Sequence, residues 1–165
     1  IQLNLGIPLI NKRVLLLGAG GAAQGVLYPL LEKKPSLLHI ANRTKEKAAV
    51  FITTPALANV IGSTQIQAKG FNELTNQQYD IVINATSAGL TDSELPLPAT
   101  LFAPNALAYD MMYGRETPFM KFAREHGAQV ADGLGMLVEQ AAEAFYLWRG
   151  VRPDTAPVIA ALRNS

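Results

Sequence analysis

Short apolar runs alternate with stretches of helical periodicity along the whole chain. The apolar runs predict strands at residues 14–17, 37–41, 64–68, 81–83, 106–110 and 129–131. The helical stretches lie at residues 22–33, from 44 onward, at 117–126 and 135–149, and from after residue 155 to residue 162. Because apolar runs of this kind are buried on both faces, the order predicts a doubly wound, mostly parallel α/β sheet of Rossmann-like class. Neither a linker nor a repeat interrupts it, so we expect residues 1–165 to form one domain.

One loop and the beginning of the chain stand apart from this alternation. Residues 91–104 contain three prolines and predict a loop beside the fourth strand. The first six residues are typical of the last turn of a helix that stops at Gly6. We therefore expect that further chain precedes Ile1.

Composition narrows the possible functions. Lys and Arg total 14 against 13 Asp and Glu, and this balance argues against a nucleic-acid or membrane-surface protein. Apolar residues make up 49% of the chain and charged residues 16%, which predicts a folded domain with its own core. The absence of cysteine excludes disulfides and thiolate metal sites, and we expect no metal. No apolar run approaches the roughly 18 residues that span a bilayer, and no signal-peptide pattern opens the chain. We therefore expect a cytoplasmic protein.

The clearest motif follows the first predicted strand and opens a helix. It reads Gly18-Ala19-Gly20-Gly21-Ala22-Ala23 and fits the dinucleotide fingerprint G-x-G-x-x-G/A. In that motif the first glycine allows a tight turn and the second lets the backbone approach a pyrophosphate. The small last residue lets the helix pack closely on the strand. The phosphate charge then meets the N–H groups of the helix N-terminus.

The residues after the second predicted strand indicate which dinucleotide binds. Cofactor sites for NAD carry an acidic residue here that holds the ribose 2′-hydroxyl, but this chain has Asn42-Arg43-Thr44, with Lys47 behind. Arg43 can form paired, charge-assisted bonds to a phosphate. Thr44 can cap the next helix and bind the same phosphate. The pattern favours NADP, and a basic solvated loop is the alternative.

Two more segments contribute candidates at the carboxyl ends of later strands. Small and hydroxyl side chains at Thr86, Ser87 and Ala88 allow a cofactor to lie close to the backbone. Met111 can pack on a nicotinamide ring and the Tyr113 hydroxyl can bind a substrate, although packing in the core is an equal alternative.

The helix that begins near Gly135 has two distinct faces. Its buried stripe is predicted to hold the following apolar residues: Leu137, Ala141, Ala144, Phe145 and Trp148. The adjacent face holds Met136, Gln140 and Glu143. Gln140 follows a glycine-rich helix start that would let a ligand approach, and a solvated glutamine is the alternative.

A general acid for reducing a ketone is not evident in the sequence. His39 lies inside the second predicted strand and is expected to be a packed core residue, while His126 ends a helix. The Tyr-Lys pair of short-chain dehydrogenases is also absent. We therefore predict a cofactor site and no catalytic residue within this chain.

Together these motifs resemble the C-terminal, NADP-binding domain of the shikimate dehydrogenase family. The resemblance covers nearly the whole chain and rests on five segments in order: residues 18–22, 42–44, 84–89, 109–113 and 132–140. It implies NADPH-dependent reduction of 3-dehydroshikimate to shikimate.

The resemblance also assigns roles. It implies that Gly18, Ala19, Gly20, Gly21 and Ala22 hold the pyrophosphate and that Asn42, Arg43, Thr44 and Lys47 hold the 2′-phosphate. Thr86, Ser87, Ala88, Met111, Gly133 and Met136 would line the rest of the cofactor, and Tyr113 and Gln140 would touch the substrate.

The resemblance implies that the family's catalytic residues belong to an N-terminal domain, which we expect to be absent from this sequence. Residues 1–12 and the helices within 135–165 would pack against that domain, and the chain alone would bind NADP(H) without turnover. Two alternatives are open. One is a quinate/shikimate dehydrogenase type, which usually takes NAD and carries an acid after the second strand. The other is a stand-alone NADP-binding sensor module.

Overall fold

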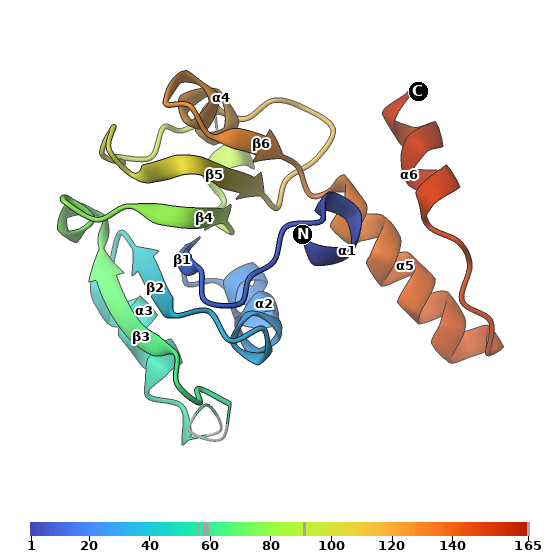
Figure 1. Ribbon diagram of the computed structural model, residues 1–165, viewed down its shortest axis with the longest axis horizontal. Coiled ribbons are helices and arrows are strands. Elements are labelled where there is room, and N and C mark those ends of the chain that lie inside the picture. The colour runs from blue at the N-terminus through green and yellow to red at the C-terminus, as the bar shows by residue number, and fades with distance from the viewer. Residues whose placement is uncertain (56, 58–59, 91, 165) are drawn as a thin grey trace.

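Six strands form a single sheet in which all neighbouring strands run parallel, in the order β3-β2-β1-β4-β5-β6 (Figure 1). The computed structural model describes every residue except 56, 58, 59, 91 and 165. The strands are β1 Arg13–Leu17, β2 Leu37–Asn42, β3 Gln65–Gly70, β4 Tyr79–Asn84, β5 Phe102–Asp110 and β6 Gln129–Ala131. The order reverses between β1 and β4, and ligands of open α/β sheets bind at such a switch point. The predicted fold class is confirmed.

Helices cover both faces of the sheet. They are α1 Gln2–Leu5, α2 Gly21–Glu32, α3 Lys45–Ile52, α4 Pro118–Glu125, α5 Leu134–Arg149 and α6 Ala156–Arg163, with the short turns η2 Phe71–Glu73 and η3 Ala88–Leu90. Within β1, Leu16 belongs to the core formed with α2 and α3, whereas Leu15 belongs to the core formed with α4. Both side chains are fully buried because successive residues of a strand point to opposite faces. None of the described helices is long and apolar enough to cross a membrane.

The fifth strand starts earlier than its sequence predicts. Apolar periodicity places its start at Ala106, but the strand begins at Phe102 and pairs with Tyr79 of β4. Pro104 and Asn105 are exposed, and Asn105 has a φ of +60°, so an irregularity interrupts the apolar pattern. The predicted loop is therefore shorter, and its first residue, Thr91, lies outside the described residues.

The predicted buried stripe of α5 is wrong. Leu137, Phe145 and Trp148 are 39%, 45% and 80% exposed, Ala141 is exposed and Ala144 is only half-buried. The buried residues are instead Leu134, Val138 and Ala142. Figure 1 shows the reason: α5 projects beyond the sheet, so only its first turns meet the core. Periodicity identifies apolar positions, but it does not say which of them find a neighbour.

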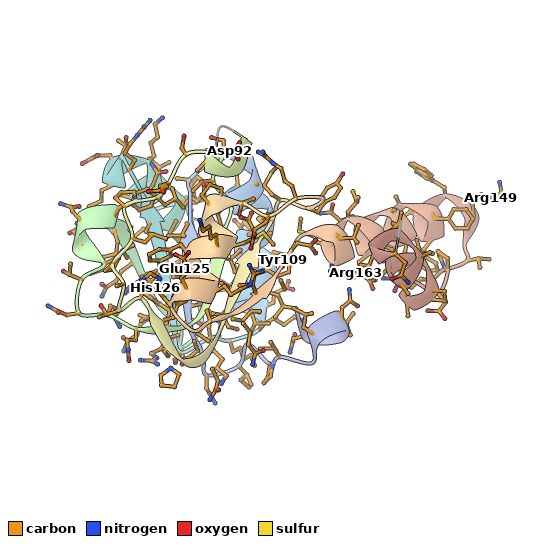
Figure 2. The ribbon with its side chains drawn as sticks, turned by 90° about the horizontal axis from the view of Figure 1, so that it is seen from above. Asp92, Tyr109, Glu125, His126, Arg149 and Arg163 are labelled. Atoms are coloured by element: carbon orange, nitrogen blue, oxygen red, sulfur yellow. The ribbon has the colours of Figure 1, made fainter. Side chains whose placement is uncertain are left out.

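The two C-terminal helices form an arm that extends away from the sheet. From above, Arg149 lies at the far tip of this arm and Arg163 lies nearer the sheet (Figure 2). Ion pairs link the segments of the arm: Arg152, between the two helices, pairs with Glu139 of α5 at 2.9 Å, and Arg163 of α6 pairs with Asp132 before α5 at 2.7 Å. At the other end of the chain, α1 stops at Gly6, whose φ of +66° confirms the predicted helix end.

His39 is a core residue, as predicted. Its side chain is 3% exposed, and its Nδ1 atom lies 2.7 Å from the hydroxyl oxygen of the buried Tyr79. Burial lowers the pKa of His39 to about 4, with a smaller contribution from the positive charge of Lys69. The neutral imidazole is therefore part of the folded core.

This burial predicts an acid sensitivity. Between pH 6.5 and 4 the unfolded chain takes up a proton at His39 and the folded chain does not, so stability falls as the pH falls and levels off below pH 4. In His39→Phe the corresponding loss is absent, and the difference in unfolding free energy between the two proteins should change by about 3 kcal/mol across that range. Urea unfolding at several pH values measures this difference. A difference that does not change with pH would contradict a neutral buried histidine.

Candidate functional site

The turn between β1 and α2 is shaped by Gly18. Its φ is +107°, and a Cβ atom there would lie 2.9 Å from the carbonyl oxygen of Ala85. Only glycine fits both conditions. A Cβ atom on Gly20 or Gly21 would meet nothing within 4 Å, so the beginning of α2 is open, whereas Ala23 is completely buried. The turn therefore has the tight bend, the open approach and the close helix packing that the motif predicts.

Backbone hydrogen bonds tie the carboxyl ends of neighbouring strands together. Gly18 N–H donates to the carbonyl oxygen of Ala41 at 2.7 Å, and Ala85 N–H donates to the carbonyl oxygen of Leu17 at 2.8 Å. Farther along the edge, Met111 N–H donates to the carbonyl of Asn84 at 3.0 Å. The turns after β1, β2, β4 and β5 consequently form one continuous edge, and the open start of α2 lies at its centre. The first N–H groups of α2 have no partner within the helix and can receive an anion.

The residues after β2 form an exposed basic segment. Asn42 closes it locally, because its Nδ2 donates to the carbonyl of Thr44 at 2.9 Å. Lys45 is neutralised by Glu73 at 2.7 Å, while Arg43 and Lys47 are exposed and form no ion pair within the part of the chain that the structure describes. Hydrogen bonds from Gly70 N–H and Lys45 also lower the pKa of Glu73. Two cationic side chains are thus available to an anionic ligand.

The expected helix cap at Thr44 is wrong. Thr44 occupies the N-cap position of α3 with an extended backbone, but its side chain accepts no capping hydrogen bond. Position alone does not make a cap, because the side chain must also turn back toward the helix.

Buried polar groups organise the loops after β4 and β5, and sequence reasoning gave them no role of their own. Asp110, the last residue of β5, accepts hydrogen bonds from Asn84 Nδ2 at 3.0 Å and from Thr117 Oγ1 at 2.6 Å. Thr86 in turn donates to Asn84 Oδ1 through its hydroxyl at 2.7 Å. The sequence did contain a signal for this network: Asp110 is a polar residue at the end of an apolar strand, and Thr117-Pro118 lies seven residues later. The predicted residues Ser87 and Ala88 follow Thr86 directly.

An apolar pocket of about 710 Å³ collects a different subset of the predicted residues. It lies among α1, α2, α5 and α6, and Met111, Met136 and Gln140 line it. Gly133 stands beside it with no room for a side chain, because a Cβ atom there would lie 2.2 Å from the Met111 carbonyl oxygen. The glycine turn, the basic segment and residues 86–88 do not line this pocket, and Tyr113 is exposed outside it.

Neither histidine lies on the edge where these turns meet. His39 pairs with Leu15 in the middle of the sheet, and His126 caps the end of α4, where its Nδ1 atom lies 2.7 Å from the Phe122 carbonyl oxygen. Over the residues that the structure describes, no group of three His, Asp or Glu side chains is arranged to hold a metal ion. The arrangement can bind an extended anionic ligand along the edge of the sheet.

The glycine turn yields a stability prediction. Gly18→Ala places a side chain in a strained conformation against the Ala85 backbone, and it should lower the unfolding free energy by at least about 2 kcal/mol. Gly25→Ala is the matched control, because Gly25 is exposed within α2 with nothing near its Cβ position, and it should stabilise the helix by about 0.5–1 kcal/mol. Urea unfolding compares the two variants. Equal stability would contradict the close approach at Gly18.

Known families match most of the chain. A model described as shikimate / quinate 5-dehydrogenase matches residues 3–91, and one described as the shikimate 5'-dehydrogenase C-terminal domain matches residues 133–163. The chain is 65% identical over 163 residues to the shikimate dehydrogenase (NADP(+)) of Methylobacillus flagellatus, with 97% of this chain and 58% of that protein covered. The chain thus spans somewhat more than half the length of this relative.

Solved structures superpose on nearly the whole chain. The crystal structure of an Ael1 enzyme from Pseudomonas putida superposes with a TM-score of 0.86 at 52% identity, and covers 98% of this chain and 58% of that one. The shikimate 5-dehydrogenase from Thermus thermophilus, solved in complex with NADP(H) and shikimate, superposes with a TM-score of 0.73 at 35% identity. That match covers 96% of this chain and 57% of the other.

Proposed function

This chain belongs to the shikimate dehydrogenase family, and we propose that it is the NADP(H)-binding part of an NADP-dependent shikimate dehydrogenase. The reaction is the reduction of the ketone of 3-dehydroshikimate: a hydride from NADPH goes to the carbonyl carbon and a proton to its oxygen, which yields shikimate and NADP⁺. The observation that carries the proposal is the glycine turn at the switch point of the sheet, together with two cations that form no ion pair among the described residues. These are Arg43 directly after the neighbouring strand β2 and Lys47 in the first turn of α3.

The turn of residues 18–22 is proposed to hold the pyrophosphate. Gly18 brings the backbone into the required bend, and the open positions of Gly20 and Gly21 leave room for the phosphates. The first N–H groups of α2 then donate to phosphate oxygens, where the positive end of the helix dipole adds to the attraction. Ala19 and Ala22 belong to the same turn, and their small side chains do not obstruct the approach.

The segment after β2 is proposed to hold the 2′-phosphate. Arg43 supplies a planar guanidinium group that can donate to two phosphate oxygens. The Thr44 hydroxyl, which makes no capping hydrogen bond, can donate to a third. Lys47 adds charge without the fork of an arginine. Asn42 holds the segment in place through its bond to the Thr44 carbonyl. Since Glu73 already neutralises Lys45, the phosphate meets the two remaining cations of the segment.

The carboxyl ends of β4 and β5 are proposed to hold the nicotinamide side. Thr86, Ser87 and Ala88 follow β4, and Met111 follows β5. Gly133 and Met136 complete this side from the start of α5. Tyr113 and Gln140 are the proposed substrate contacts, and the exposure of both side chains is compatible with that role.

Catalysis by the whole protein is proposed to need residues beyond these, because neither histidine reaches the cofactor edge. Exposed apolar side chains mark where a further domain would pack: Leu3 in α1, and Phe145, Leu147 and Trp148 in the arm. The arm and residues 1–12 would contact a domain that corresponds to the remaining length of the curated relatives. Such burial would remove from water the apolar surface that the arm exposes.

A quinate/shikimate dehydrogenase with NAD is the second candidate, since the matching family model carries both substrate names. Arg43 and Thr44 stand where NAD sites usually place an acid, and this favours NADP. A stand-alone NADP-binding sensor is the third candidate. Oxidation of NADPH on addition of 3-dehydroshikimate, measured with a longer form of the protein, distinguishes an enzyme from a sensor.

Titration calorimetry with NADP⁺ and NAD⁺ at low salt tests the cofactor proposal. NADP⁺ should bind more tightly, and Arg43→Ala should weaken its binding by roughly 10- to 150-fold, the value of about 1.5–3 kcal/mol for one charge-assisted bond. Binding of NAD⁺ should be nearly unchanged in the variant. Arg124→Ala is the control: it removes an arginine of α4 that pairs with Glu116, and it should leave both affinities unchanged. Equal binding of the two nucleotides would overturn the assignment of Arg43.

Binding without turnover is the second expectation. This chain should bind NADPH, yet NADPH absorbance should not decrease when 3-dehydroshikimate is added. The full-length Methylobacillus flagellatus relative serves as the positive control. Measurable oxidation of NADPH by the chain alone would place an acid/base within these 165 residues and contradict the proposed division of labour.

A further inference from the structure

Asp110 ends β5 as a fully buried acidic residue with hydrogen-bond donors from three directions. Its Oδ2 accepts from Asn84 at the end of β4 and from Thr117 at the start of α4. Its Oδ1 accepts from the backbone N–H of Met112 at 2.9 Å. Thr117 Oγ1 also accepts the Met120 N–H at 3.3 Å, so one side chain joins two loops and a helix start.

The hydrogen bonds continue from Asp110 in one direction. Asn84 donates through Nδ2 to Asp110, which leaves Oδ1 to accept the Thr86 N–H at 3.1 Å and the Thr86 hydroxyl at 2.7 Å. Thr86 Oγ1 then accepts the Ala88 N–H at 3.3 Å. A carboxylate can only accept, so Asp110 determines which side of the Asn84 amide faces Thr86. The orientation of residues 86–88 therefore depends on an acceptor side chain located on the neighbouring strand.

We propose that Asp110 is a positioning residue for the nicotinamide side of the bound cofactor. The inference rests on the proposed function, which places this side of the cofactor against residues 86–88 and Met111. Asp110 touches neither cofactor nor substrate. It acts through the Asn84 amide on one loop and through the Met112 N–H on the other.

The two loops are also in direct contact, so a change in one reaches the other. A Cβ atom on Gly89 would lie 3.2 Å from both the Met112 and Thr117 side chains, which shows how closely the segments pass. The side chain of Arg115 bridges the same gap by donating to the Gly89 carbonyl and pairing with Asp92. Interior packing of this kind transmits small displacements.

The basic segment after β2 lies outside this network. Its own contacts run from Asn42 to Thr44 and from Lys45 to Glu73. The two ends of the cofactor are thus held by separate sets of bonds, and a ligand that carries only one end can tell them apart. Adenosine 2′,5′-bisphosphate carries the adenosine and the 2′-phosphate but lacks the nicotinamide.

The test compares NADPH with adenosine 2′,5′-bisphosphate on the intact chain. Asp110→Asn introduces an amide donor where all neighbours donate, and it should weaken NADPH binding about 10-fold or more, as expected for a lost charge-assisted bond. Affinity for the bisphosphate should stay within about twofold, which is close to the limit of such comparisons. The fluorescence spectrum of bound NADPH, which reports the surroundings of the nicotinamide, should shift toward that of free NADPH.

Three variants separate positioning from stability. Thr117→Val removes one donor to Asp110 and should act in the same direction, whereas Thr117→Ser keeps the hydroxyl and should bind as the wild type does. Asp80→Asn is the matched control: Asp80 lies at the opposite end of the sheet and binds Arg13 at 2.8 Å, so its loss should lower the melting temperature without separating the two ligands.

Each outcome is informative. If Asp110→Asn weakens both ligands equally, or weakens neither while the melting temperature falls, Asp110 is only structural and the inference is overturned. If that variant does not fold, Thr117→Val carries the comparison under the same criterion. Failure of the proposed function looks different: the wild-type chain would bind neither ligand, or Arg43→Ala would leave binding of the bisphosphate intact.

Discussion

The geometry of the carboxyl edge of the sheet depends on the close approach of Gly18 to the carbonyl of Ala85. A parallel sheet brings the ends of β1 and β4 together, but any side chain at residue 18 would force the two turns apart. With glycine there, the turns share a continuous edge, and the start of α2 opens at its centre. The first N–H groups of α2 have no partner within the helix and lie next to a reversal in strand order, so they can receive an anion before any side chain contributes.

Charge around this edge is distributed unevenly. Lys45 is neutralised by Glu73, while Arg43 and Lys47 are exposed to solvent without an acidic partner among the described residues. Exposed ion pairs contribute little to stability. The main consequence of this arrangement is therefore that Arg43 and Lys47 are accessible to an anion. Farther along the edge, the buried Asp110 side chain accepts hydrogen bonds from Asn84, Met112 and Thr117. One end of the edge thus has exposed cationic side chains, and the other has a buried acidic side chain whose oxygens are bonded within the protein.

The arm made by α5 and α6 follows a different physical rule. Its inner contacts are ionic and solvated, as in the pair between Arg152 and Glu139, while Trp148 and Leu147 face water. Apolar surface of this extent is typical of a face that another part of a protein covers. The pocket of about 710 Å³ lies where α5 leaves the sheet, and residues of α1, α2, α5 and α6 line it.

The sequence alone determined the class of the fold and the residues of the glycine turn, because periodicity and glycine placement are local properties. It also indicated Arg43 without an acidic neighbour, and it placed His39 correctly in the core. Only the tertiary structure decided which face of α5 is buried, since that depends on where the sheet ends. It likewise decided that Thr44 does not cap its helix and that Asp110 joins two loops. The buried face of α5 and the bond between Asp110 and Asn84 depend on segments far apart along the chain, so their physical cause is absent from any local pattern of residues. The missing cap depends on the direction of one side chain, which the residue type does not determine.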